Sequence, residues 1–296
     1  MIDSLDFQYQ RINITQGGIV YSIREEKKVA MISQIKSLES ELVIPRSIIH
    51  EAKEYIITGI LERILNKSSP IKSIKFSMDS ELQSIGSLSF ARSSIESITI
   101  PSSTTVIGDM AFYRCEKLQQ VEFPADSKLK KIGKSAFCET SVKKLTIPIN
   151  LIEIDNSAFE SCKNLQYVEI PADSKLQIIC EDAFCDTSIE IINVPSTVVE
   201  LKGGWCRNNS KLKEIKIDPK NSHYKVYDNM FIIGKSSESS ENFNVLYTCY
   251  RDIEKVTIPD FIEIIENNAF YKLEKLNHIE FSPNSSLRII NPHAFA

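Results

Sequence analysis

The chain has 296 residues, of which 42% are hydrophobic and 25% are charged, and its formal net charge is −4 at pH 7. This composition is ordinary for a globular protein with a large core, so it excludes a disordered chain. Lys and Arg are scattered among Glu without a basic cluster, which argues against nucleic-acid binding. No window approaches the roughly 18 apolar residues of a membrane helix, and residues 1–16 lack the apolar run of a signal peptide. No membrane-spanning segment and no export signal are therefore predicted.

Two ladders of short motifs run through the chain with the same period. An apolar residue precedes proline at Pro101, Pro124, Pro148, Pro171 and Pro195, in steps of 23, 24, 23 and 24 residues. A small residue precedes phenylalanine at Phe90, Phe112, Phe137, Phe159, Phe184, Phe270 and Phe295. A period in the low twenties predicts repeats of leucine-rich-repeat size, each a strand plus a short return segment.

A single repeat of this length cannot fold alone. Ordering its backbone costs about 1–2 kcal/mol per residue, whereas its half-dozen buried apolar side chains return only about 1.5–3 kcal/mol each. Stacked repeats share one core, so stability grows as a sum over neighbours. The sequence therefore predicts a solenoid.

Each repeat is predicted to contain one short strand. The stretch LQYVEIP, residues 165–171, alternates apolar with polar residues and ends at a proline, which cannot donate to a parallel ladder. One such proline per repeat predicts that the strands end at the same height and form one even sheet. The return arm, as in SKLKKIGKSAF of residues 127–137, is expected to hold turns and short helical segments on the convex side, with the phenylalanines stacked along it.

The pattern in IPSSTTVIGDMAFYRC, residues 100–115, resembles the BspA-type leucine-rich repeat found in surface proteins of anaerobic bacteria and in parasitic protists. This resemblance implies a right-handed, curved leucine-rich-repeat solenoid with a parallel β-sheet on its concave face. It also implies a β-rich N-terminal cap with a first degenerate repeat over residues 1–69, followed by repeats of about 23–25 residues over 70–296. Cys180 in place of glycine, and Trp205 in place of the Ala-Phe pair, depart from the pattern.

An insertion interrupts the array between Pro219 and Pro259, which are 40 residues apart. Residues 223–250 contain two β-prone arms around a tip rich in Ser and Glu, which predicts a hairpin with Phe231 in the Ala-Phe position. This hairpin is either structural or a contact loop for a partner. Farther on, SLRIINPHAFA stops at an Ala-Phe position without a polar cap, so we expect the natural chain to continue.

No signature of catalysis or of a metal site is present in the sequence. Cys115 and Cys162 lie three residues after a ladder phenylalanine, and Cys138 and Cys185 lie one residue after it. They are therefore interpreted as small hydrophobic residues of the repeat. C-x-x-C pairs are absent and the four histidines are scattered, so neither a metal nor a cofactor is predicted. The usual hydrolase, metalloprotease and nucleotide-binding motifs are also absent, so the chain is predicted not to be an enzyme.

Outward positions on the predicted strands define the candidate binding face. One row is Thr99, Glu122, Thr146, Glu169, Asn193, Lys216, Thr257 and Glu280, and the other is Ser97, Gln120, Lys144, Tyr167, Ile191, Glu214, Lys255 and His278. Tyr167 and Ile191 place apolar area side by side on a polar face, as binding anchors do, although single exposed apolar residues are also common. The predicted partner site consists of Tyr167, Ile191, Lys144, Glu169, Asn193 and Glu214.

These features predict a non-enzymatic protein–protein interaction module. The resemblance implies a cell-surface adhesin that binds host matrix proteins or other microbial surface proteins, and hence a cell-surface or secreted location. The missing signal peptide favours instead an intracellular, cytoplasmic leucine-rich-repeat scaffold or recognition protein, and the free thiols suit a reducing compartment. Both interpretations stay open at the level of sequence.

Overall fold

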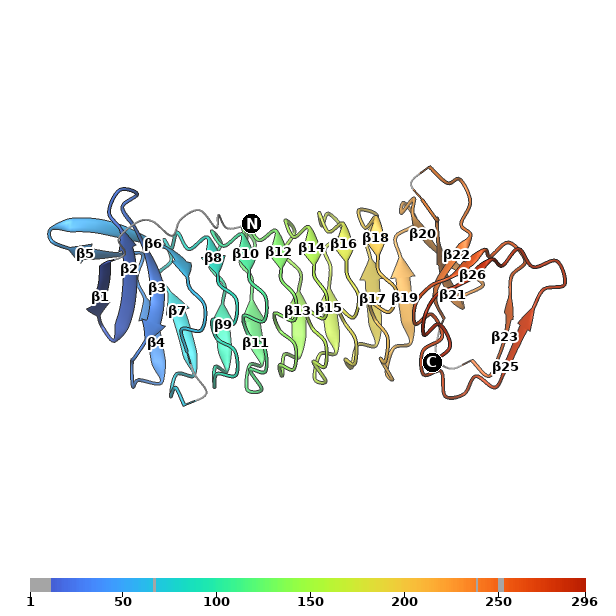
Figure 1. Ribbon diagram of the computed structural model, residues 1–296, viewed down its shortest axis with the longest axis horizontal. Helices are drawn as coiled ribbons and strands as arrows, with labels where there is room; N and C mark the ends of the chain where they lie inside the picture. Colours follow the sequence, from blue (N-terminus) through green and yellow to red (C-terminus); the bar gives the residue numbers. More distant parts are fainter. Residues whose placement is uncertain (1–11, 66–67, 238, 250–252) are drawn as a thin grey trace.

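The computed structural model describes residues 12–65, 68–237, 239–249 and 253–296. Figure 1 shows an elongated stack of strands that begins with a group of antiparallel strands at its N-terminal end. These strands are β1 (Ile12–Gln16), β2 (Ile19–Arg24), β3 (Val29–Ile35), β5 (Ser47–His50) and β6 (Lys53–Ile60). β3 pairs with β6 in parallel, so the chain passes there from antiparallel strands into the repeats.

One continuous parallel sheet follows from β6 along one side of the stack. Its strands are two residues long: β8 (Ser84–Ile85), β10 (Val106–Ile107), β12 (Lys131–Ile132), β14 (Glu153–Ile154), β16 (Ile178–Ile179) and β18 (Glu200–Leu201). Each lies in the return arm of a repeat, where only turns and helical segments were expected. The solenoid therefore has two ladders of strands in each turn rather than one.

The predicted strands before the prolines form a second set along the stack. They are β4 (Glu41–Ile44), β7 (Ser73–Phe76), β9 (Ser97–Thr99), β11 (Gln120–Glu122), β13 (Lys144–Thr146), β15 (Tyr167–Glu169), β17 (Ile191–Val194) and β19 (Glu214–Ile217). We call the outward surface of β9–β19 the front face, and it corresponds to the predicted concave face.

The expectation of one even sheet on the front face is wrong. The order β11-β9-β7-β4 forms one sheet, whereas β13-β15 and β17-β19 are separate pairs. No backbone hydrogen bond joins β11 to β13 or β15 to β17, and all four strands lie in the described part of the chain. Strands whose first residues are 23 apart pair fully, whereas those 24 apart are unpaired or, for β7 and β9, paired over two residues only. The extra residue in alternate repeats thus interrupts the ladder.

Turns, not helical segments, connect the two ladders on the far side, so the helical part of the prediction is wrong. Each turn contains two residues with positive φ, four positions apart, such as Ser135 (52°) with Glu139 (57°) and Ser157 (56°) with Ser161 (57°). A right-handed helix needs φ near −63° at every residue. The left-handed residues therefore prevent even one helical turn, and the turn amides bond to the next repeat instead, as from Phe137 to the carbonyl of Ala158 at 2.8 Å.

A phenylalanine stack fills the core beneath these turns, as the sequence predicted. The rings of Phe90, Phe112, Phe137, Phe159 and Phe184 are stacked, with centroids 5.1, 5.0, 5.3 and 5.4 Å apart. Trp205 ends the stack, because its ring meets Phe184 edge-on at 6.5 Å and 82°.

The inserted segment divides the core of the protein in two. It contains three antiparallel strands, β20 (Tyr224–Tyr227), β21 (Phe231–Gly234) and β22 (Val245–Cys249). After it, the C-terminal repeats contain β23 (Lys255–Ile258) paired with β25 (His278–Phe281), and β24 (Ile264–Ile265) paired with β26 (Ile289–Ile290). On the buried strand β21, Ile232 belongs to the larger, N-terminal core, whereas Phe231 and Ile233 belong to the smaller core of the C-terminal repeats.

Candidate functional site

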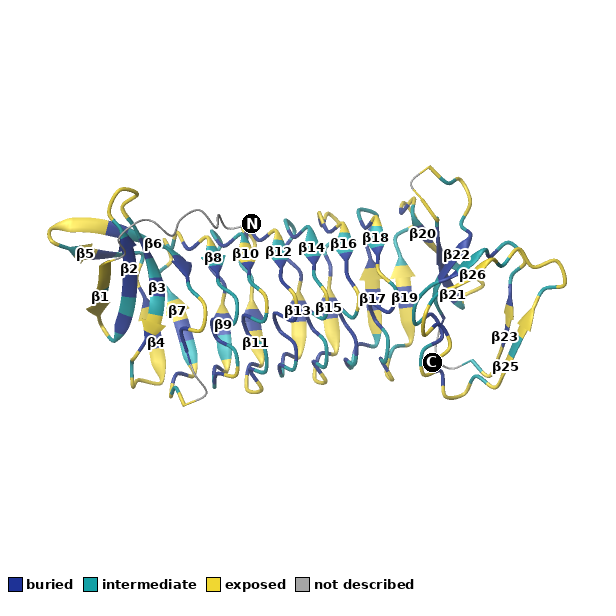
Figure 2. Ribbon diagram, viewed as in Figure 1, coloured by how far each residue is buried: buried dark blue, intermediate teal, exposed yellow. Residues whose placement is uncertain are grey.

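All six predicted site residues lie exposed on the front face, on β13, β15, β17 and β19. Figure 2 shows these strands with yellow, exposed residues between buried ones. Tyr167 is 61% exposed and Ile191 is 43% exposed, and they sit on β15 and β17, two neighbouring but unpaired strands. Lys144 stands opposite Tyr167 in register, and Glu214 stands opposite Ile191. The structure thus brings the predicted residues together on adjacent strands.

Carboxylates on this face are held by threonines of the preceding strand. The hydroxyl of Thr146 donates to Glu169 at 3.2 Å, and that of Thr99 donates to Glu122 at 3.2 Å. The same arrangement recurs in the C-terminal repeats, where Thr257 lies 3.4 Å from Glu280. Alternating Thr and Glu therefore spaces the negative charges and orients them.

Most charges along these strands are compensated by a neighbour. The ion pairs are Lys75–Glu41 at 2.9 Å, Lys72–Glu96 at 3.6 Å, Lys213–Glu190 at 2.7 Å, Lys216–Glu214 at 3.5 Å and Lys255–Glu280 at 2.8 Å. Lys143 and Lys144, in contrast, have no carboxylate within 4 Å in the described part of the chain. The front face therefore carries two uncompensated ammonium groups beside Tyr167, and the sequence did not single out Lys143.

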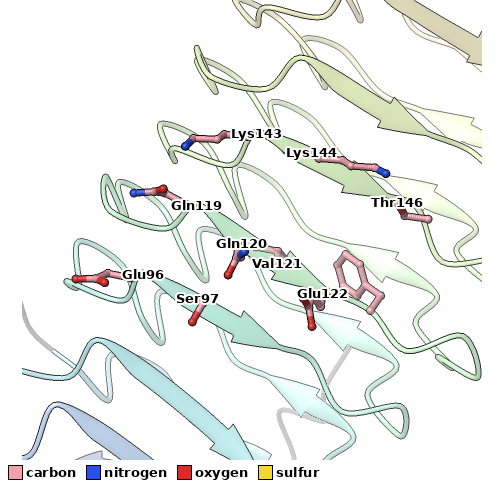
Figure 3. A pocket seen from close by; sticks show the side chains of 10 residues that line it. Glu96, Ser97, Gln119, Gln120, Val121, Glu122, Lys143, Lys144 and Thr146 are labelled. Carbon is pink, nitrogen blue, oxygen red and sulfur yellow. The ribbon is translucent and has the colours of Figure 1, made fainter.

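Two hollows open on the front face, the first at the break between β11 and β13 and the second over β17 and β19. Figure 3 shows the first, of about 770 Å³, with the side chains of β9, β11 and β13 around it. It is lined by Glu96, Ser97, Gln119, Gln120, Val121, Glu122, Phe123, Lys143, Lys144 and Thr146. The second, of about 910 Å³, is lined by Ile170, Ala172, Ile191, Asn193, Val194, Pro195, Lys213, Glu214, Ile215, Lys216, Ile217, Asp218, Pro219, Val226 and Asn229. The first is thus lined mainly by polar and charged residues, whereas the second combines apolar with charged residues.

Buried polar side chains form a further ladder that sequence reasoning missed. The thiols of Cys115 and Cys162 donate to the carbonyls of Phe90 and Phe137 at 3.0 and 3.1 Å. Asn209, 47 residues after Cys162, donates from Nδ2 to the carbonyl of Phe184 at 3.0 Å. Interpreting the cysteines as small hydrophobic residues was therefore incomplete, because two of them also donate hydrogen bonds to buried carbonyls.

One cluster has the residue types of a metal site. Oxygens of Glu153 and Asp155 and the sulfur of Cys180 lie within 4.8 Å of one another. The ammonium of Lys131, however, lies 2.7 Å from each carboxylate. Burial disfavours this ammonium, but its hydrogen bonds to Asp155 and Glu153 outweigh burial and raise the pKa of Lys131. A lysine thus already supplies the positive charge of this cluster.

The thiols offer no activated nucleophile in the part of the chain that the structure describes. All seven cysteines are buried, and Cys115, Cys138, Cys162, Cys180 and Cys185 are free thiols. Burial raises the pKa of Cys115 and Cys162 to about 11, so both are protonated at neutral pH.

No helix among the described residues is long and apolar enough to cross a bilayer.

A family model describes most of the chain. Residues 52–166, 130–245 and 242–296 match the BspA type leucine rich repeat region, with six copies of the repeat. No curated protein matches the chain significantly.

Solved structures of bacterial proteins share the fold. The pneumococcal vaccine antigen PcpA is 22% identical with a TM-score of 0.71, over 96% of this chain and 67% of that chain. A leucine rich cell surface protein from Faecalibacterium prausnitzii is 21% identical with a TM-score of 0.64, over 96% and 77%. A leucine-rich repeat protein from Bacteroides ovatus is 20% identical with a TM-score of 0.50, over 94% and 90%. At these identities the likeness establishes the fold alone.

Proposed function

Because the chain belongs to the BspA-type leucine-rich repeat family, we propose that it is a protein-binding module whose front face holds a protein partner at the cell surface. The observation that carries this proposal is the pair Tyr167 and Ile191, exposed on neighbouring strands of an otherwise polar face. Burying such side chains contributes about 1.5–3 kcal/mol each. A partner that covers both side chains therefore gains binding free energy from each of them.

Polar residues around the pair would orient the partner. Lys144, Glu169, Asn193 and Glu214 surround the two apolar side chains on β13 to β19. Exposed charges at the rim of an interface contribute more to specificity and association rate than to affinity. The six residues together form the proposed partner site.

The surface location and the adhesin role rest on two supports. The family's repeats resemble those of bacterial surface proteins, and two proteins of the same fold are described as a cell surface protein and a vaccine antigen. Host matrix proteins, or surface proteins of other microbes, are the partner class this role implies.

An intracellular recognition protein is the second candidate function. It is favoured by the free and buried thiols of Cys115, Cys138, Cys162, Cys180 and Cys185, because free thiols suit a reducing compartment. Biotinylation of intact cells with a membrane-impermeant reagent separates the two candidates. We expect labelling before lysis, and a protein that is labelled only after lysis would eliminate the adhesin role.

The partner site is tested with a double substitution, Tyr167→Ala with Ile191→Ser. Binding to a panel of immobilised matrix proteins and intact microbial cells is measured by surface plasmon resonance and cell adhesion, together with the melting temperature. We expect binding at least 10-fold weaker, about 1.4 kcal/mol or more, with an unchanged melting temperature. The matched control is Val106→Ser, since Val106 is 38% exposed on β10, away from the front face. Wild-type binding by the double variant would refute the site.

A further inference from the structure

The first break in the front-face ladder exposes backbone groups of β13. In a parallel ladder, alternate residues direct both N–H and C=O to the same side. The N–H of Ile147 donates to the carbonyl of Glu169 at 2.8 Å, so odd-numbered residues of this strand face β15. Lys144 and Thr146 therefore direct their backbone groups toward β11, to which no hydrogen bond runs.

The facing edge of β11 is equally open. The carbonyl of Glu122 accepts from the N–H of Ile100 at 2.9 Å, so Glu122 faces β9 and its neighbours Val121 and Phe123 face β13. All four residues with open backbone groups, Val121, Phe123, Lys144 and Thr146, line the first hollow. The hollow in Figure 3 is thus a site where hydrogen bonds of the ladder are missing.

The second break repeats this arrangement 47 residues later. Val194 faces β19, because its carbonyl accepts from the N–H of Asp218 at 2.9 Å. Ile191 and Asn193 therefore face the unpaired edge of β15. The core confirms the opening, since Val168 on β15 is 6% exposed, whereas Leu145, its counterpart on the preceding strand, is 1% exposed.

The two breaks offer similar backbone groups but different side chains. At the first, Glu96 is paired with Lys72, which leaves Lys143, Lys144 and Glu122 and a net charge of +1. At the second, Ile191 lies beside Ile170, Val194 and Pro195, and the two lysines of the same hollow, Lys213 and Lys216, are paired with Glu190 and Glu214. Free backbone N–H groups beside ammonium groups favour a carboxylate ligand, because hydrogen bonds to a charged acceptor are stronger than those between neutral groups. The second break favours an apolar side chain.

We infer that the front face binds an extended protein segment that places a carboxylate side chain in the first break and an apolar side chain at the second. The breaks are two strands apart, about 10 Å at about 4.8 Å per strand. An extended chain of the polyproline II type spans that distance in about three residues, at about 3.1 Å per residue, and its three residues per turn direct side chains three positions apart to the same side. The inference rests on the proposed function and specifies the chemistry of the partner segment.

Amide hydrogen exchange in the full chain tests whether the backbone groups are open. The amides of Lys144 and Ile191 are expected to exchange with little protection. The amides of Ile147 and Asp218, which donate to the carbonyls of Glu169 and Val194 at 2.8 and 2.9 Å on the paired sides of the strands, are expected to be protected at least 10-fold more. Equal protection at all four amides would overturn the inference, because the breaks would then be closed in solution.

Fluorescent twelve-residue Gly/Ser peptides test the occupant. One carries Glu and, three positions later, Leu; two others replace Glu with Lys or Leu with Ser. Fluorescence anisotropy is expected to show saturable binding of the Glu/Leu peptide. The peptides with Lys in place of Glu, or Ser in place of Leu, are expected to bind at least 10-fold more weakly. Lys143→Glu with Lys144→Glu should lower affinity for Glu/Leu at least 10-fold and raise it for Lys/Leu. The matched control, Lys130→Glu with Lys134→Glu, changes exposed lysines off the front face and should have no effect.

Failure of this inference is distinguishable from failure of the proposed function. Equal binding of all three peptides, no binding of any, or indifference to the charge reversal at Lys143 and Lys144 would overturn the two-break inference. The proposed function would still stand if Tyr167→Ala with Ile191→Ser abolished binding to a matrix protein or cell. If that variant also bound as the wild type does, both would fall.

Discussion

Buried polar residues of the repeat act as donors to the backbone of the preceding repeat. The fully buried thiol of Cys162 reaches the carbonyl of Phe137 and lies 3.2 Å from the hydroxyl of Thr140. One two-repeat step later, Asn209 and Thr187 make the corresponding contacts. Cysteine and asparagine are thus alternative solutions to one need, which is to satisfy a carbonyl that no strand reaches.

Replacing Cys162 with alanine is expected to destabilise the protein by about 1–3 kcal/mol, because a buried carbonyl loses its donor. Cys162→Asn copies the residue that the chain uses at position 209 and is expected to cost less than Cys162→Ala. Urea denaturation of both variants measures the free energy of unfolding. An alanine variant as stable as the wild type would show that the thiol acts through packing alone.

Thiol ionisation makes stability fall at high pH. Burial raises the pKa of Cys115 and Cys162 to about 11 and that of Cys138 and Cys185 to about 12, whereas an unfolded thiol titrates near about 8.5. Above that pH the unfolded state therefore binds fewer protons than the folded state. The free energy of unfolding keeps its full value below that pH and decreases as the pH rises toward 11 and 12. Urea midpoints from pH 7 to 10.5 measure the decrease. A chromogenic thiol reagent at pH 8 should react only after unfolding, and rapid reaction of the native protein would contradict the burial.

Residue-level prediction succeeded where the strand period decides exposure. Tyr167 and Ile191 are outward by alternation alone, and the structure places both in solvent. The period says nothing about which ion pairs form, so the uncompensated Lys143 was missed. It likewise cannot show that a buried thiol faces a lone carbonyl, because that depends on the conformation of the neighbouring turn.

At the scale of elements, the turns depend on strained backbone at ordinary residues. Most left-handed positions are occupied by non-glycine residues such as Met110, Ser157 and Asp182. Each costs about 1–2 kcal/mol relative to a relaxed conformation. The stacked core and the hydrogen bonds between repeats must offset this cost.

Ser157→Gly should therefore stabilise the protein, since glycine adopts the φ of 56° found there without steric cost. Greater backbone freedom of glycine in the unfolded state offsets part of the gain, so we expect about 0.5–1 kcal/mol. Thermal unfolding measures it. Ser157→Ala is the control, because its Cβ keeps the strain, and an equal gain from alanine would refute strain as the cause.

The strands of the front face were predictable and the other ladder was not. An alternating stretch ending in proline marks β9 to β17 in the sequence. A two-residue strand such as β12 is too short for any periodic signal, so its ladder was missed. The left-handed conformation of the turns was not predictable either, because the sequence places serine, aspartate and methionine, rather than glycine, at the positions with positive φ.

At the scale of the whole molecule, the inserted strands β20, β21 and β22 connect the N-terminal core to the core of the C-terminal repeats. At the open edge of β18, the phenol of Tyr224 accepts from the N–H of Leu201 at 2.8 Å and donates to the carbonyl of Val199 at 3.3 Å. A side chain thus replaces the next strand. On the turn side, Arg207 is hydrogen-bonded to Asp182 and lies 4.7 Å from the ring of Tyr271, which links the N-terminal to the C-terminal repeats.

Tyr224→Phe is expected to cost about 1–3 kcal/mol, because it leaves the N–H of Leu201 without its acceptor. The loss should appear at the junction, with the C-terminal repeats unfolding at a lower temperature than the N-terminal ones. Differential scanning calorimetry combined with hydrogen exchange measures this separation. Tyr227→Phe is the matched control, since Tyr227 is 36% exposed on the same strand. A single transition at the wild-type temperature would show that the phenol does not couple the cores.

The overall architecture was the most predictable level, because two ladders of one period permit little besides a solenoid. Division of the core was not predictable, because it depends on Ile232 and Ile233 facing opposite ways across β21. The sequence shows only an apolar run at that point.

Because steps of 23 and 24 residues alternate, the structural repeating unit of the array is two turns rather than one. Paired strands, open breaks and the buried Cys or Asn donor all repeat with the 47-residue translation. The array therefore keeps its pattern only when residues are added or removed in whole two-turn units of 47 residues. Excising residues 124–170 would preserve the order of paired and open edges, whereas excising a single turn would bring two edges of the same kind together.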